Sequence, residues 1–289
     1  MRIEELLNEG KKFHIEHGDC LQFLKKLPDQ SVDLVITSPP YNLGQEYEKR
    51  VSFESYLQFQ ERVIKECVRI LKDNGSICWQ VGNYKEKQEN FPLDIFLYSI
   101  FKKFNLTLRN RIIWHFRAGL GSNRKFYKKY ETILWFTKSD NYTFNLDPVR
   151  IPRRYPQKKF KHGKNIGKCK GSALGKNPGD VWLIPLVNNI HPEKTAHPCQ
   201  FPIGLIERLI LSLSNKGDIV LDPFIGSGTT AVASLLHNRR CIAIEKERKY
   251  IDIIHQRIHE SQKKGFKYKS YLNPKLFKFF TKFESSFSQ

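Results

Sequence analysis

The tetrapeptide Ser38-Pro39-Pro40-Tyr41 follows closely on an apolar run at residues 32–36. The run is too short for a helix and predicts a buried parallel strand, which the prolines end in a stiff loop. The Ser38 hydroxyl and the Pro39 carbonyl can accept the N–H groups of a conjugated amino group, which frees the nitrogen lone pair to react. Tyr41 offers an aromatic face for a base flipped out of its stack. By itself, the tetrapeptide is equally consistent with a loop that only ends a strand.

Residues 219–245 read as strand, glycine-rich turn, helix and strand, and the unit ends on Glu245. Such a unit binds a nucleoside-bearing cofactor at the carboxyl edge of a parallel sheet. Gly226 and Gly228 let the backbone approach the ligand, and the carboxylate can accept two ribose hydroxyls. The pattern G-x-G-x-x-A also fits the dinucleotide fingerprint, so a nicotinamide-dependent oxidoreductase is an alternative. Asp222 would repel a pyrophosphate and favours a cationic cofactor.

Three segments together resemble the amino-methylating DNA methyltransferases, which act on cytosine N4 or adenine N6. D-P-F-I-G-S-G-T-T at 222–230 is similar to their cofactor motif, and T-S-P-P-Y at 37–41 is similar to their catalytic motif. H-P-C-Q-F-P at 197–202 is similar to the block that precedes the cofactor motif in one permuted group. The catalytic motif comes first, which is the beta arrangement of the family. The resemblance covers about 13–140 and 178–260, and implies a bacterial restriction–modification enzyme that uses S-adenosylmethionine.

The resemblance also implies roles for individual residues. Catalysis would fall to Ser38, Pro39, Pro40 and Tyr41. The implied cofactor-binding residues are Asp19, Asp222, Phe224, Gly226, Gly228, Thr229, Glu245 and Gln200.

Several of these residues have ordinary structural alternatives. Asp19 suits the N-cap of a following helix equally well, and Phe224 suits a core position. Cys199 lies in a Pro-Cys-Gln tripeptide like the nucleophile of cytosine-C5 methyltransferases. Because the tripeptide precedes the cofactor motif, we interpret Cys199 as incidental. Ser38 and Phe201 favour cytosine N4 over adenine N6, since family members with Ser at the first catalytic position more often methylate cytosine.

The net charge of the chain is +20, from 49 Lys and Arg against 29 Asp and Glu. The charge is concentrated in residues 101–130, 141–180 and 261–289, which carry +9, +8 and +6. Aromatic residues lie among the cations of the first two stretches: Trp114, Phe116, Phe126, Tyr127, Tyr155 and Phe160. Cations interleaved with aromatics suit phosphate contact and base stacking in a nucleic acid. The resemblance implies that this nucleic acid is double-stranded DNA. A generally lysine-rich proteome is the alternative for residues 261–289.

Alternating strand and helix patterns predict an α/β fold, with a Rossmann-like, mostly parallel mixed sheet and helices on both faces. The four tryptophans, in strand-like contexts, are expected in the core. Strands are expected at 13–17, 32–36, 76–81, 111–116, 132–137, 219–221 and 241–244. Helices are expected at 21–27, 53–72, 91–104 and 247–260, from Pro202 and after the glycine-rich turn.

The expected catalytic and cofactor-binding domain comprises residues 1–140 and 197–262. Residues 141–196, where the periodicity dissolves, are the expected target-recognition region, and residues 263–289 are a basic tail.

No run of the chain approaches the ~18 apolar residues of a membrane span. Residues 1–12 lack the apolar centre of a secretory signal. The cysteines show neither metal-ligand spacing nor a disulfide framework, and His115 and His162 have no partners at ligand spacing. We expect a bacterial cytoplasmic protein with no metal site and no membrane association. A cognate restriction endonuclease, not in a stable complex, and a second copy of the chain are further candidate partners.

Overall fold

The computed structural model describes residues 12–272, except 47, 88, 118–122, 125, 154, 156–158, 169–171, 173 and 269. The strands of its main sheet are β1 (Phe13–His17), β2 (Val32–Thr37), β3 (Leu71–Val81), β6 (Thr107–His115), β7 (Tyr130–Thr137), β8 (Val181–Leu183), β9 (Ile219–Asp222) and β10 (Arg240–Glu245).

These strands lie in the order β1-β10-β9-β2-β3-β7-β6-β8. The strands from β1 to β3 in this order are parallel to one another. Strand β7 runs antiparallel to β3 and β6, and β8 pairs in parallel with β6. The expected mixed, mostly parallel sheet is confirmed.

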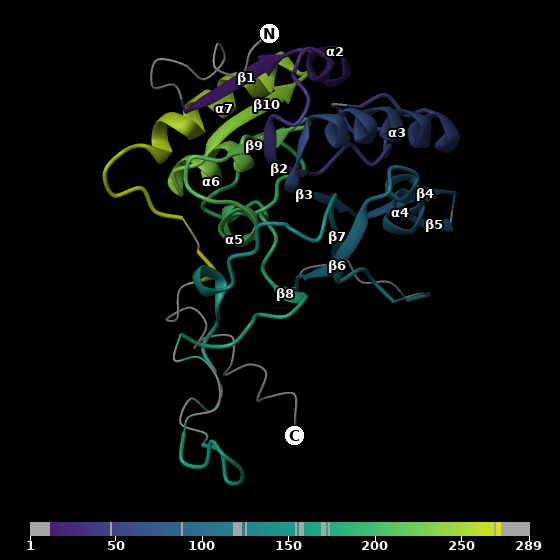
Figure 1. Cartoon of the computed structure of the whole chain (residues 1–289). Coiled ribbons are helices and arrows are strands. Elements are labelled where there is room, and N and C mark those ends of the chain that lie inside the picture. Colours follow the sequence, from purple (N-terminus) through teal and green to yellow (C-terminus); the bar gives the residue numbers. More distant parts are fainter. Residues whose placement is uncertain are drawn as a thin grey trace.

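Helices cover both faces of this sheet (Figure 1). Helices α2 (Cys20–Leu24), α3 (Phe53–Ile70) and α4 (Leu93–Lys103) pack on one face, and α5 (Ile203–Leu213), α6 (Thr229–Leu236) and α7 (Arg248–Ser261) pack on the other. Consecutive residues of β2 alternate between the two cores, with Val35 facing α3 and Ile36 facing α5. Because both faces are covered, the central strands are continuous apolar runs.

Several short elements were not predicted, because they depend on contacts with other segments rather than on a local sequence pattern. Strands β4 (Asn83–Glu86) and β5 (Glu89–Pro92) form a separate hairpin, and Asp147–Val149 forms a single turn of 3-10 helix. Strand β8 lies inside the expected target-recognition region, yet it extends the main sheet, where Trp182 pairs with Trp114 of β6. The neighbouring residues 159–168 extend away from the sheet (Figure 1). No helix in the described part of the chain is long and apolar enough to cross a membrane.

Two aromatic residues expected to stack on bases belong to the core instead. Trp114 and Phe116 are only 2% and 4% exposed. Their side chains point to the face covered by α5, where the Trp114 indole N–H donates to the Ile184 carbonyl at 2.8 Å. The expectation is therefore wrong for these two, whereas the core position expected of all four tryptophans is confirmed. Phe126, Tyr127 and Tyr155 are exposed, and Phe160 is half-buried.

Gly75 in β3 marks a close approach to β2. A Cβ added there would lie 2.7 Å from the Asp33 carbonyl oxygen and 2.7 Å from Leu71 Cδ1. Gly75→Ala should lower the free energy of unfolding by about 1–3 kcal/mol, because the β2 backbone would have to shift. Gly18→Ala is the matched control, since no atom lies within 4 Å of its added Cβ. Chemical denaturation compares the two, and equal losses would contradict the predicted clash.

Candidate active site

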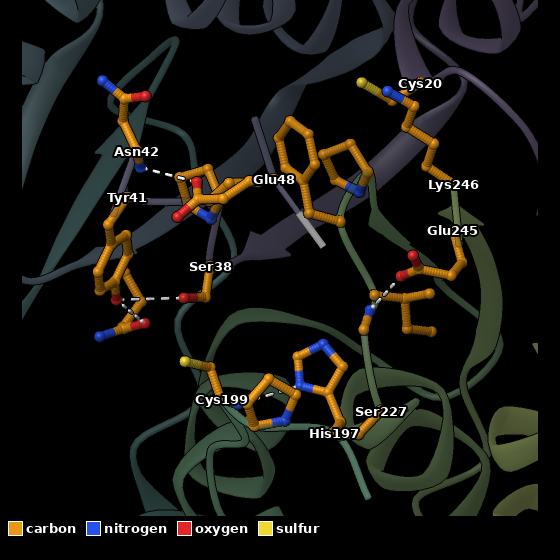
Figure 2. Close-up of a pocket in the computed structure, with 18 of the residues that line it drawn as sticks. Cys20, Ser38, Tyr41, Asn42, Glu48, His197, Cys199, Ser227, Glu245 and Lys246 are labelled. Carbon is orange, nitrogen blue, oxygen red and sulfur yellow. Dashed lines mark hydrogen bonds between the residues drawn. The ribbon is translucent and has the colours of Figure 1, made fainter. Parts of the chain in front are cut away.

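A cavity of about 750 Å³ opens at the carboxyl ends of the parallel strands. Residues that follow β1, β2 and β9, the end of β10, one side of α3 and segment 197–201 line it. In Figure 2 the loop after β2 lies on one side with Ser38 and Tyr41, and Glu245 lies on the other. Open α/β sheets bind ligands at this edge, which makes the cavity the candidate active site.

The tetrapeptide Ser38–Tyr41 lines the cavity along its whole length. Ser38 Oγ lies 3.2 Å from Tyr41 Oη, and Tyr41 Oη donates to Gln80 Oε1 at 2.8 Å. Burial raises the pKa of Tyr41 well above 10, so the phenol keeps its proton. The serine hydroxyl and the tyrosine ring are therefore oriented by the neighbouring strand β3.

Glu131, at the start of β7, extends this polar wall. Its Oε2 accepts from Gln80 Nε2 at 2.5 Å and lies 3.5 Å from Tyr41 Oη. The ammonium of Lys128 contacts its other oxygen. Gly82 permits this packing, because a Cβ there would lie 2.9 Å from Glu131 Oε1 and 3.1 Å from Tyr41 Cε2. The wall thus presents hydroxyl, amide and carboxylate oxygens to one region of the cavity.

Asn42 shapes the loop that leaves the tetrapeptide. Its φ of 59° lies in the left-handed region, which asparagine tolerates better than most residues. Its amide donates to the Val51 carbonyl at 2.7 Å and accepts the Val51 N–H at 2.8 Å. Glu48 accepts the N–H groups of Asn42 and Leu43 at 2.8 and 2.6 Å. These bonds close residues 42–51 into a compact loop at the rim of the cavity.

The glycine-rich turn after β9 lies across the cavity from the Ser38–Tyr41 loop. Gly226 has a φ of 54°, and its N–H donates to Glu245 Oε2 at 2.9 Å. A Cβ on Gly226 would lie 2.9 Å from His197 Nε2, so a side chain there would displace the imidazole. His197 also packs on Tyr250, with ring centroids 4.4 Å apart. Burial lowers the pKa of His197 to about 4, which leaves the ring neutral.

Glu245 is 8% exposed and borders the cavity at the end of β10. Its Oε1 accepts the Glu247 N–H at 2.8 Å, and its other oxygen accepts from Gly226. A carboxylate has about four acceptor sites, so these two backbone bonds leave room for further donors. Burial raises the pKa of Glu245 to about 7. A ligand that donates hydrogen bonds here, such as a ribose, would favour the ionised form.

Asp222 is fully buried at the end of β9, outside the lining of the cavity. Thr37 and Thr230 donate their hydroxyl groups to its two oxygens, each at 2.6 Å. The Phe224 N–H donates to the same carboxylate at 3.1 Å. Burial raises its pKa to about 6. Asp222 therefore ties the end of β2 to the turn and to α6.

Comparisons with known proteins agree with this geometry. The family model for N6 and N4 methyltransferases, described as DNA methylase, matches residues 32–256. The chain belongs to this family.

The type II methyltransferase M.BglII of Bacillus subtilis is 47% identical over 243 residues, which cover 84% of this chain and 68% of that protein. TTHA0409 of Thermus thermophilus, solved in complex with S-adenosyl-L-methionine, is 28% identical, with a TM-score of 0.63 over 88% of this chain and 96% of its own. PvuII DNA methyltransferase (cytosine-N4-specific) shares the fold at 20% identity, with a TM-score of 0.68 over 89% of this chain and 88% of its own. The expected resemblance to amino-methylating DNA methyltransferases is confirmed.

The methyltransferase cavity gathers most of the residues predicted to bind the cofactor. Asp19, Gln200, Phe224, Gly226 and Glu245 line it, whereas Asp222, Gly228 and Thr229 do not.

Besides Asp222, Gly226 and Glu245, three more of the eight residues have clear structural partners. Asp19 caps α2 by accepting the Gln22 N–H at 3.0 Å, and the same residue also lines the cavity. Gln200 binds within its own segment, donating to the Glu193 carbonyl at 2.6 Å and accepting from Thr195. Thr229 accepts from Arg257 at 3.0 Å. Contact of each with the cofactor stays a prediction.

Several residues of the cavity wall were not predicted as site residues. Gln80, Glu131 and His197 line the cavity, although only His197 falls in a motif. Strands β3 and β7 bring the first two to Tyr41 from 39 and 90 residues away, which no local pattern signals. Arg257 of α7 donates to the Ser227 carbonyl at 2.7 Å and so supports the turn from behind.

Some polar atoms in the cavity lining have no hydrogen-bond partner among the described residues. A polar cofactor could supply these hydrogen bonds. Tyr56 Oη and both polar atoms of the Gln60 amide are buried without a hydrogen-bond partner, and both residues line the cavity. Buried polar groups are nearly always hydrogen-bonded. Phe59 and Phe224, with centroids 6.1 Å apart, add aromatic surface beside them. Together with Glu245, this lining fits a nucleoside-bearing cofactor.

Metal-ligand geometry does not occur in the part of the chain that the structure describes, where no three His, Cys, Asp or Glu side chains gather. Cys199 also lines the cavity, and its incidental role stays a prediction.

Substitutions at Asn42 separate its conformation from its hydrogen bonds. Asn42→Gly loses the bonds to Val51, but glycine keeps the left-handed backbone. Asn42→Ala loses the bonds to Val51 and also disfavours the left-handed backbone. Its free energy of unfolding should therefore fall by about 1 kcal/mol more than that of the glycine variant. The methylation rate should follow the same order, since the loop begins next to Tyr41. Denaturation and labelled-methyl incorporation measure the two effects, and equal losses in both variants would exclude a role for the backbone conformation.

Proposed function

We propose that this methyltransferase transfers the methyl group of S-adenosylmethionine to N4 of cytosine in duplex DNA, after the base has flipped into the cavity. The observation that carries the proposal is one cavity shared by the Ser38–Tyr41 loop and the Gly226–Glu245 edge. The solved complex of TTHA0409 with S-adenosyl-L-methionine supports the choice of cofactor. A nicotinamide-dependent oxidoreductase would leave the Ser-Pro-Pro-Tyr loop without a use.

The residues on the Glu245 side would hold the cofactor. When bound, S-adenosylmethionine supplies an electrophilic methyl group on its sulfonium. Glu245 would accept the ribose hydroxyls, and Phe224 would pack on an apolar face of the cofactor. The Gln60 amide would form hydrogen bonds with the ligand. The turn at Gly226 would keep the backbone close to it. Asp222 would act indirectly, by holding the turn in place.

The residues on the Ser38 side would hold the target base. Ser38 Oγ and the Pro39 carbonyl would accept the two N–H groups of the exocyclic amine, which frees the nitrogen lone pair. Tyr41, fixed by Gln80 and Glu131, would support the face of the flipped base. Positioning and exclusion of water would supply most of the rate, and no covalent enzyme intermediate is needed.

The choice of cytosine rests on the space beside the Ser38 hydroxyl, the proposed acceptor of the amine. Serine is small and leaves room for a pyrimidine, and Phe201 narrows the same cavity from segment 197–201. The family methylates adenine N6 as well, and the same loop could hold that amine. Adenine N6 is therefore the second candidate for the reaction.

Target recognition would fall to residues 141–196. Leu186, Val187 and Asn188 at the end of this region line the cavity, which connects it to the target base. Side chains of its exposed part, including Tyr155, would contact DNA, together with Phe126 and Tyr127 of the β6–β7 connection. DNA affinity should then fall steeply with salt, as phosphate contacts require.

We also propose partner proteins and a cellular location for the enzyme. Similarity to a type II methyltransferase supports a partner endonuclease that cuts the same sequence without forming a stable complex. A cytoplasmic location and a homodimer are further parts of the proposal, and light scattering would test the second.

Identification of the methylated nucleoside tests the reaction. The protein is incubated with labelled S-adenosylmethionine and duplex DNA of mixed sequence, which is then digested and examined by mass spectrometry. N4-methylcytosine is expected. N6-methyladenine would establish the second candidate, and 5-methylcytosine would restore Cys199 as a nucleophile. Label in RNA alone would overturn the choice of substrate.

Ser38→Ala tests the acceptor role. The variant should lower kcat by about 100-fold, the typical effect of removing one hydrogen bond to a reacting group, while cofactor binding is retained. Ser31→Ala is the control, because its hydroxyl donates to the Pro28 carbonyl outside the cavity. Full activity of Ser38→Ala would exclude the proposed role.

The pH dependence of cofactor binding tests Glu245. Because its pKa is about 7 without ligand, the carboxylate gains a proton as the pH falls from 7 to 5.5. Ribose hydroxyls bind the ionised form, so the Kd should rise by up to about tenfold per pH unit. His197, with a pKa of about 4, stays neutral over this range. Glu245→Gln should bind weakly at every pH. A slope that persists in this variant would assign the titration to another group, such as Asp222.

A further inference from the structure

A second cavity, of about 310 Å³, lies on the face of the sheet that α5 covers. Its walls come from β6, β7, β8, α5 and two segments of the 141–196 region, residues 144–149 and 177–180, and it shares no lining residue with the active site. Trp135, Trp182 and Phe144 give it aromatic walls. A cavity of this size and composition suits a small planar ligand.

Arg208 of α5 brings a buried positive charge to this cavity. The residue is 5% exposed and lines the cavity, and its guanidinium carbon lies 4.9 Å from the centre of a Trp182 ring. Its Nε is buried without a hydrogen-bond partner, and within the described residues Arg208 forms no ion pair. Burial lowers its pKa to about 10, so the guanidinium is still charged at neutral pH.

The adjacent acid favours this charge only at a distance, since no described hydrogen bond or ion pair joins Glu207 to Arg208. Glu207 is also buried, but its carboxylate accepts from Tyr268 at 2.5 Å and from Ser270 at 2.6 Å, and it pairs with His237 at 3.0 Å. A buried cation without a bonded anion is costly, and an anion that enters beside it relieves that cost.

We propose that this cavity binds a small planar aromatic carboxylate, whose ring lies among Trp135, Trp182 and Phe144 and whose carboxylate pairs with Arg208. Asn110, Asn177 and Ser212 supply polar groups around the ring. The exposed carboxylate of Asp180 also lines the cavity, which disfavours ligands with more than one negative charge. A ligand bound here would contact two segments of the 141–196 region, residues 144–149 and 177–182.

The four tryptophans allow a direct test by NMR of the indole N–H signals in 15N-labelled protein. Indole-3-carboxylate is the probe, and indole-3-carboxamide is a neutral probe of the same shape. The carboxylate should shift the signals of Trp135 and Trp182, and spare those of Trp79 in the core and Trp114 at the active site. It should bind at least about tenfold more tightly than the carboxamide, the factor expected of a charge-assisted pair. Equal affinities, or shifts confined to Trp114, would overturn the proposal.

Two substitutions with opposite effects identify the charge that is recognised. Arg208→Met should weaken the carboxylate at least about tenfold and leave the carboxamide unchanged. Asp180→Asn, at an exposed position, should tighten the carboxylate by about threefold. Arg248→Met is the control, because that side chain is 70% exposed on α7. If Arg208→Met fails to fold, Asp180→Asn decides alone, and an unchanged affinity in that variant would overturn the assignment.

Discussion

The carboxylate of Asp222 is the contact on which the active site depends. It accepts from Thr37 and Thr230 at 2.6 Å each, and so joins the residue before Ser38 to the helix that follows the glycine-rich turn. The two threonines belong to segments that are adjacent only because β2 pairs with β9. The loop proposed to hold the target base and the turn proposed to hold the cofactor are thereby kept at a defined separation. A buried, three-fold hydrogen-bonded carboxylate is a rigid link, because each donor would be left unsatisfied if it moved.

From this link the cavity divides into two walls with different chemistry. The wall around Ser38 is a chain of hydrogen-bonded polar groups that ends at Glu131, and it can orient an amine without supplying a strong base. The opposite wall contains Glu245, whose carboxylate is buried enough to have a pKa of about 7. Burial makes that carboxylate sensitive to what it binds, since a donor in the cavity replaces the lost water. Positioning, rather than covalent chemistry, is what such an arrangement can contribute to methyl transfer.

The positive charge of the chain lies mostly outside the segments that line the active-site cavity. Motif residues lie in the nearly neutral part of the chain, and the basic stretches border it. Burial decides which of their aromatic residues lie on the outer surface: Phe126 is fully exposed, whereas Trp114 belongs to the core and to the cavity wall. The guanidinium of Arg208 differs from these basic surface residues, because it lies inside the protein beside the Trp182 ring and forms no ion pair with any residue that the structure describes.

The sequence by itself determined the longer elements, the family and the segments of the site. Apolar runs and glycine turns are local signals, so β2, β9 and the motifs at 37–41 and 222–230 could be located from residue types and spacing. Only the tertiary structure decided which side chains face the cavity. It placed Asp222 behind the wall and Gln80 and Glu131 within it, and it joined β8 to the sheet. The physical reason is that strand register and packing set the direction of each side chain, and both depend on partners far away in the chain.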